Sequence, residues 1–175
     1  MPKQPDNVIF VFGLPASFSH LKFNIAMSNA RHPLVVIFLL HIALEIPLAI
    51  QGVWSPNALP FLELNNTTIV LLKLYSALSL STCLISLLCY SLPDFLPGKR
   101  ALAMGLCVYH SVASTVFFQA PRFIPHSLGP LAEQYKVTPE IVWGTLHGLI
   151  GLGMVAWWQV TVPLTSLARA ASKGS

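Results

Sequence analysis

Charged residues are scarce in this chain of 175 residues. Asp, Glu, Lys and Arg make up 9% of the sequence, whereas soluble proteins contain about 25%. Six acidic and ten basic side chains are too few to give a globule of this size a soluble surface. Disorder is also disfavoured, because it requires low hydrophobicity and 54% of the residues are hydrophobic. The composition argues against a cytosolic enzyme and indicates an integral membrane protein surrounded by the lipid bilayer.

Several motifs are missing as well. The basic residues are scattered and form no Lys/Arg cluster, so the net charge of +4 does not indicate a nucleic-acid partner. The three cysteines, Cys83, Cys89 and Cys107, include no C-x-x-C pair and predict neither a disulfide framework nor a zinc signature. There is no nucleotide-binding loop, haem motif or Ser/His/Asp arrangement. We therefore expect no nucleic acid, no cofactor and no metal.

Long apolar segments are abundant. A bilayer core about 30 Å thick requires roughly 20 apolar residues in a helix, and four segments meet this requirement: 34–54, 69–92, 101–120 and 141–162. Their backbone must form its hydrogen bonds internally, which favours helices. The sequence therefore predicts an all-α membrane protein, a bundle of four transmembrane helices. Residues 1–33 are expected to form a tail that could include an interfacial helix, and residues 163–175 a second tail.

Hydroxyl and proline residues mark the expected helix ends. Thr67 or Thr68 is expected to cap the second helix, and Pro93 with Pro97 to end it. Thr138, followed by a proline and a glutamate, is expected to cap the fourth helix.

The distribution of basic residues predicts the orientation. Lys99 and Arg100 lie in the second loop and five more basic residues lie in the tails, whereas the first loop has none and the third has two. Because cytoplasmic segments carry the excess of Lys and Arg, both termini are expected in the cytosol. Asn65 and Asn66 begin two N-x-Thr sequons in the first loop, on the opposite side. They are candidate glycosylation sites and favour the endoplasmic reticulum.

Ionisable residues inside the apolar segments are the first candidates for function, because they are costly in a bilayer. Glu45 and His110 lie near the middle of the first and third segments. The helical rise places His147 roughly 6 Å to the lumenal side of its segment's centre. These three residues could meet near the bilayer midplane, with Lys73 and Gln51 at the lumenal mouth of the pocket.

His41 and Glu45 are four residues apart and share one helix face. A lone carboxyl group at the midplane must be protonated or paired with a base, and the deep bases are histidines. An acid and a base that face each other in an apolar pocket can exchange a proton with an apolar ligand. The candidate acid–base or ligand-lining residues are therefore Glu45, His41, His110 and His147.

The H-x-x-x-E pair of His41 and Glu45, in the first of four spans, resembles the sterol-isomerase and sigma-2-receptor family of four-helix proteins. The resemblance covers these two residues. Acidic residues that this family places in later helices have no counterpart, since 69–92 and 101–120 contain no Asp or Glu.

Two further stripes follow helical spacing. Hydroxyl residues on the second helix share a face that is expected to look inward or at a partner helix: Tyr75, Ser79, Thr82 and Ser86. On the fourth helix, Gly144, Gly148 and Gly151 are expected to allow close helix packing.

Three functions are compatible with these features. The first is binding of an apolar ligand or of a partner helix, from another membrane protein or a second copy of the chain. The second is a membrane-embedded isomerase or cyclase that acts by proton transfer on a sterol- or terpene-like substrate. The third is a proton-coupled carrier, which would require a dimer. Convergence of Glu45, His110 and His147 around a cavity would favour a ligand site or an enzyme over an assembly factor. The three histidines could also bind a metal if the helix pairing brings them together.

Overall fold

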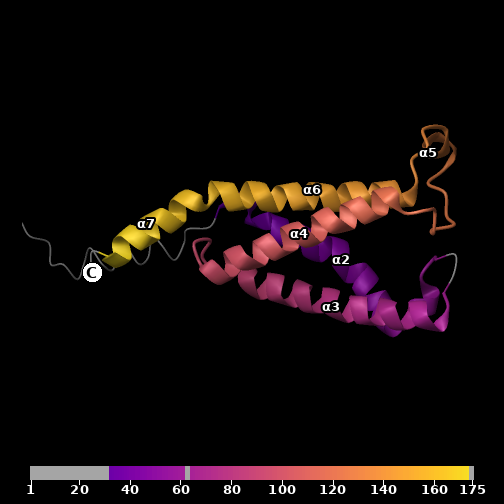
Figure 1. Ribbon diagram of the computed structural model, residues 1–175, viewed down its shortest axis with the longest axis horizontal. Helices are drawn as coiled ribbons and strands as arrows, with labels where there is room; N and C mark the ends of the chain where they lie inside the picture. Colours follow the sequence, from indigo (N-terminus) through magenta and orange to yellow (C-terminus); the bar gives the residue numbers. More distant parts are fainter. Residues whose placement is uncertain (1–31, 62–63, 174–175) are drawn as a thin grey trace, which may run out of the picture. The chain divides into compact units, whose positions relative to one another are not determined.

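The computed structural model describes residues 32–61 and 64–173, and this part of the chain forms helices and no strand (Figure 1). The four long helices are α2 (Val36–Trp54), α3 (Asn66–Tyr90), α4 (Pro97–Gln119) and α6 (Pro139–Val160). The short ones are η1 (Pro33–Val35), η2 (Pro56–Ala58), α5 (Pro130–Gln134) and α7 (Val162–Lys173). The all-α prediction is confirmed. Nearly all of the tail expected over 1–33 lies outside the described residues, and the tail expected over 163–175 contains most of α7.

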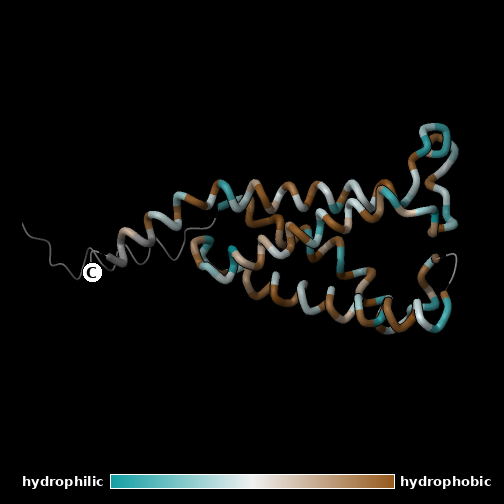
Figure 2. The backbone as a smooth tube through the Cα atoms, in the orientation of Figure 1, coloured by the Kyte–Doolittle hydropathy of each residue, from teal (hydrophilic) through white to brown (hydrophobic). Residues whose placement is uncertain are grey.

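Each of the four predicted spans corresponds to one helix that is long and apolar enough to cross a membrane. Figure 2 shows that hydrophobic residues predominate along these helices and that hydrophilic ones gather at the connections. Large aliphatic side chains point outward and are more than half exposed, among them Leu74, Leu78, Val108 and Leu152. Polar side chains such as His41, His110 and His147 are buried together with an apolar core, so the outer surface is more apolar than that of a soluble helical bundle.

Two expected helix ends are corrected. The side chain of Asn65, and not Thr67 or Thr68, caps α3: its Oδ1 accepts a hydrogen bond from the backbone N–H of Thr68 at 2.9 Å. Pro97 begins α4 instead of ending α3, because its missing N–H costs nothing at the first helical position. The expected cap of α6 is confirmed, since Thr138 accepts a hydrogen bond from the backbone of Ile141.

The helices pack mainly in two pairs, α2 with α3 and α4 with α6, and α2 also contacts α6. The glycine face of α6 packs against α4, where a Cβ on Gly148 would lie 3.0 Å from Ser114 Oγ. Gly52 of α2 has the same role against α3, because a Cβ there would collide with Ser76. The glycine stripe of α6 thus serves packing within the chain, and a partner helix would have to use another surface.

An apolar core fills one end of the structure around Phe38 and Trp157, whose rings meet edge to face at 5.2 Å between centroids. Above it, Lys99 Nζ lies 2.8 Å from Asp94 Oδ1, and both side chains are fully buried. The ammonium group also donates to two backbone carbonyls, those of Tyr90 and Leu92. Lys99 therefore holds the α3–α4 connection in place. The sequence analysis used this residue only to predict the orientation and did not identify its structural role.

Candidate functional site

Four ionisable side chains from three helices meet in the interior. His41 and Glu45 come from α2, His110 from α4 and His147 from α6, and none is more than 2% exposed. Spacing along α2 places the first two on one face, and the close packing of α4 on α6 brings in the others. The predicted convergence of Glu45 with His110 and His147 is therefore present.

The three imidazoles form a chain through the ring of His110. His41 Nδ1 lies 3.0 Å from His110 Nε2, and His110 Nδ1 lies 2.9 Å from His147 Nδ1. The chain continues to the carboxyl group, since His147 Nε2 is 3.8 Å from Glu45 Oε1. A neutral imidazole has one N–H and one lone pair, so neighbouring rings can satisfy each other in turn.

Glu45 is surrounded by hydroxyl groups on its other side. Tyr75 and Ser79 donate hydrogen bonds to Oε2 at 3.1 and 3.0 Å, and Tyr109 donates to Oε1 at 2.8 Å. The two tyrosine hydroxyls also contact each other at 2.5 Å. Two residues of the hydroxyl stripe on α3, Tyr75 and Ser79, thus contact the carboxyl group of α2, whereas Thr82 donates to the backbone carbonyl of Ser79.

Tyr109 was not among the residues predicted for the site. It follows the exposed Val108 on α4, is itself half-buried, and donates its hydroxyl hydrogen bond to Glu45. A signal for it exists in the sequence: tyrosines in membrane proteins concentrate at the interfaces, whereas Tyr109 and Tyr75 lie well inside apolar segments.

A cavity of about 250 Å³ adjoins the hydroxyl side of this cluster, between α3 and α4. Most of its wall is aliphatic, and the hydroxyl-bearing residues Tyr75, Ser79 and Tyr109 form part of its lining. Leu78, at the rim, is 65% exposed, so the cavity reaches the outer surface of the helices. The exposed wall is almost wholly apolar, and Tyr75, Ser79 and Tyr109 both line the cavity and hydrogen-bond the carboxyl group of Glu45.

A second apolar cavity of about 250 Å³ lies beside the C-terminal half of α2. Its lining includes Gln51, Phe117 and Trp143. The last two rings lie 5.4 and 6.4 Å from the ring of His147. Gln51 therefore stands at a pocket, as predicted, but this pocket adjoins the histidine side of the cluster. Lys73 is exposed on α3 and lines neither cavity.

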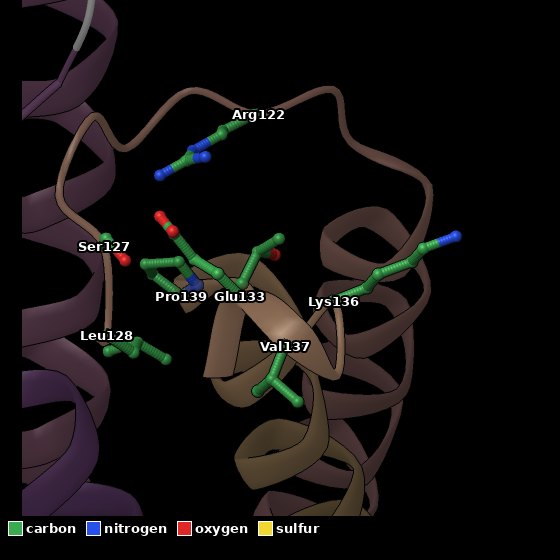
Figure 3. A pocket seen from close by; sticks show the side chains of 8 residues that line it. Arg122, Ser127, Leu128, Glu133, Lys136, Val137 and Pro139 are labelled. Carbon is green, nitrogen blue, oxygen red and sulfur yellow. The ribbon is translucent and has the colours of Figure 1, made fainter. Parts of the chain in front are cut away.

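The connection between α4 and α6 contains a third, more polar cavity of about 340 Å³ (Figure 3). The side chains of Arg122 and Glu133 point toward each other across it, while that of Lys136 points away. Glu140 anchors this connection, because its Oε1 accepts hydrogen bonds from the backbone of Phe123 and Ile124 at 2.9 and 2.8 Å. This cavity shares no lining residue with the buried cluster.

The arrangement can bind a polar group at the end of an apolar molecule. Hydroxyl groups both donate and accept hydrogen bonds, and the carboxyl group behind them fixes their direction. The same constellation contains candidates for acid and base roles within hydrogen-bond reach of one another. Comparison with known proteins adds no family to this description: no family model, no curated protein and no solved structure matches the chain.

Proposed function

We propose that the protein is a multi-pass membrane protein, a four-helix bundle in the bilayer, that binds an apolar, membrane-soluble molecule between α3 and α4. Four apolar helices and an outward-facing aliphatic surface support the membrane location. The orientation follows from the basic residues, with both termini in the cytosol. The sequons at Asn65 and Asn66 favour residence in the endoplasmic reticulum.

One observation carries the ligand proposal: Tyr75 and Tyr109 both line the α3–α4 cavity and both hydrogen-bond Glu45. Ligand sites combine an apolar wall with a few polar groups. This cavity has an apolar wall, and the polar groups belong to the residues that line it. The ligand places its apolar body against Leu78 and Leu102 and a hydroxyl group at the tyrosines, whose oxygen atoms accept its hydrogen bond because their own hydrogens are donated to Glu45. A volume of about 250 Å³ accommodates a small molecule or the polar end of a larger one.

A cavity-filling substitution tests the proposal without touching the cluster. Gly105 lies in the cavity lining, and a Cβ added there would have no neighbour within 4 Å. Gly105→Leu should therefore leave the helix packing intact but place a side chain in the ligand's space. Gly98, on the same helix, is equally open and lies outside the lining, so Gly98→Leu is the matched control.

The measurement is mass spectrometry of lipids that are extracted from the purified full chain. A compound enriched with the wild type and with Gly98→Leu, and reduced at least tenfold in Gly105→Leu, is the expected result. Equal content in all three proteins would contradict binding in this cavity, and size-exclusion chromatography verifies that each variant is folded.

A second candidate function is an isomerase or cyclase that acts by proton transfer on a sterol- or terpene-like molecule. The observation that favours it is the carboxyl group placed next to two tyrosine hydroxyls at the cavity wall. Positioned acids and bases contribute typically 10²–10⁴-fold to a rate. Comparison of the lipids of a host that expresses the wild type or Glu45→Gln tests it. A product that forms only with the wild type supports catalysis, and identical lipid profiles leave ligand binding as the function.

A further inference from the structure

The histidine side of the cluster offers a set of metal ligands. His41, His110 and Glu45 each present one ligand atom, and these atoms all lie within 4.8 Å of one another in a fully buried position. The His41 Nδ1 and His110 Nε2 atoms face each other at 3.0 Å. Bonds of 2.0–2.1 Å in a tetrahedral site place ligand atoms about 3.3 Å apart. Small side-chain rotations therefore convert the observed arrangement into a coordination site.

The charges of the site support a cation. A carboxylate away from water requires a compensating partner, and the ion pairs among the described residues give Glu45 one basic neighbour, His147 at 3.8 Å. The buried Asp94, by contrast, has Lys99 at 2.8 Å. The partners of Glu45 are otherwise hydroxyl groups, which hold a carboxylate in place without neutralising it. A divalent ion would supply the missing positive charge.

The surroundings of these residues resemble the outer shell of a metal site. A histidine ligand usually donates its second ring N–H to a neighbouring acceptor, which fixes the ring and raises its basicity. His110 has such a neighbour. Its Nε2 faces His41, and its Nδ1, on the other side of the ring, lies 2.9 Å from His147 Nδ1. Ser79 and Tyr75 hold the Oε2 atom of Glu45 in the same way.

We propose that His41 Nδ1, His110 Nε2 and the carboxylate of Glu45 bind one divalent transition-metal ion, with His147 as the outer partner of His110. Two imidazoles and one carboxylate suit Zn²⁺ and Fe²⁺ and leave coordination positions open. The site shares Glu45 with the hydrogen bonds of Ser79 and Tyr109, which line the ligand cavity, but neither His41 nor His110 is in that lining. It is additional to ligand binding, and either can fail without the other.

The test uses the full chain without an affinity tag, purified in detergent and stripped with a chelator. Zn²⁺ content after loading is measured by mass spectrometry of the metal, and Co²⁺ is titrated while its visible ligand-field absorption is recorded. The wild type should bind one Zn²⁺ per chain and give a saturable Co²⁺ spectrum. His41→Ala and His110→Ala should each lose more than a hundredfold in affinity, and His147→Ala about tenfold to a hundredfold.

His126→Ala is the matched control, because His126 is exposed in the α4–α6 connection and its loss should leave both measurements unchanged. The proposal is overturned if the loaded wild type contains less than about a tenth of an ion per chain. It is equally overturned if His110→Ala binds Zn²⁺ as tightly as the wild type. Since the Co²⁺ spectrum of the wild type reports nitrogen and oxygen ligation directly, the result stands even if an alanine variant fails to fold.

Discussion

Two of the buried carboxyl groups in the described part of the chain, those of Asp94 and Glu45, have different kinds of partner. Asp94 is paired with a permanent cation, Lys99, whereas Glu45 is surrounded by hydroxyl groups and an imidazole. The Asp94–Lys99 pair has no part in ligand binding, so its role is to stabilise the fold. The partners of Glu45 can exchange, because each hydroxyl can also bond to a ligand. Substitutions at the two positions should therefore have different consequences.

Glu45→Gln should reduce the co-purified ligand at least tenfold and leave the fold intact. The amide keeps the size of the side chain but can no longer accept all the hydrogen bonds that Tyr75, Ser79 and Tyr109 donate. Lipid extraction measures the ligand, and circular dichroism measures the helix content. Glu133→Gln, at an exposed position, is the control. A stable Glu45→Leu protein with full ligand content would refute any role for the carboxyl group.

Asp94→Ala should destabilise the protein by about 3–5 kcal/mol, because it leaves the ammonium group of Lys99 buried without its counter-charge. Replacing both partners, in Asp94→Leu/Lys99→Met, should recover most of that loss, since neither position then holds an unpaired buried charge. Thermal unfolding in detergent measures both effects. If the double variant is no more stable than Asp94→Ala, the ion pair is not the reason for the loss.

At the scale of the helices, glycines decide how closely the elements approach. Gly148 lets α6 pack on α4, and Gly52 lets α2 pack on α3, where a side chain would meet Ser76. Only the first of these positions belongs to a G-x-x-x-G pattern that the sequence analysis could identify. The contact at Gly52 depends on which helix α2 packs against, and that pairing is not encoded in local spacing.

Gly52→Ala should lower the free energy of unfolding by about 1–3 kcal/mol, the usual cost of overpacking. Gly105→Ala is its control, because that site has no neighbour within 4 Å and alanine favours the helix by up to about 1 kcal/mol. The measurement is again thermal unfolding in detergent. Equal stability of the two variants would show that α2 and α3 separate more easily than their packing indicates.

At the scale of the whole molecule, the proposed membrane topology has four spans, so the segments that precede α2 and follow α6 would lie on the same side of the membrane. The α2–α3 connection with Asn65 should then face the lumen. In a eukaryotic host we expect glycosidase treatment to shift the electrophoretic mobility of the wild type but not of an Asn65→Gln/Asn66→Gln variant. A C-terminal epitope should be accessible to antibody when only the plasma membrane is permeabilised. Glycosylation of a sequon engineered into the α3–α4 connection would contradict this topology.

Much of the fold and part of the site could be predicted from the sequence. Apolar length located the four helices, and the helical rise placed Glu45, His110 and His147 at similar depths. Depth does not show which helices are neighbours or which way a side chain points around the axis. For that reason Tyr109 and the buried role of Lys99 were missed. Lys73, expected at the mouth of a pocket, is in the lining of neither apolar cavity described above. The proposed metal ligands likewise become visible only when α2 and α4 are seen together.

The position of the α3–α4 cavity has a consequence for how its occupant arrives. Since the two tightly packed pairs are α2 with α3 and α4 with α6, the cavity lies on the seam between pairs and is reached past the exposed Leu78. A hydrophobic compound would enter sideways from the lipid without crossing water. Its partition into the bilayer then sets how full the cavity is, and each tenfold enrichment there is equivalent to about 1.4 kcal/mol of affinity. Because of this enrichment in the bilayer, even a site with modest intrinsic affinity can remain occupied.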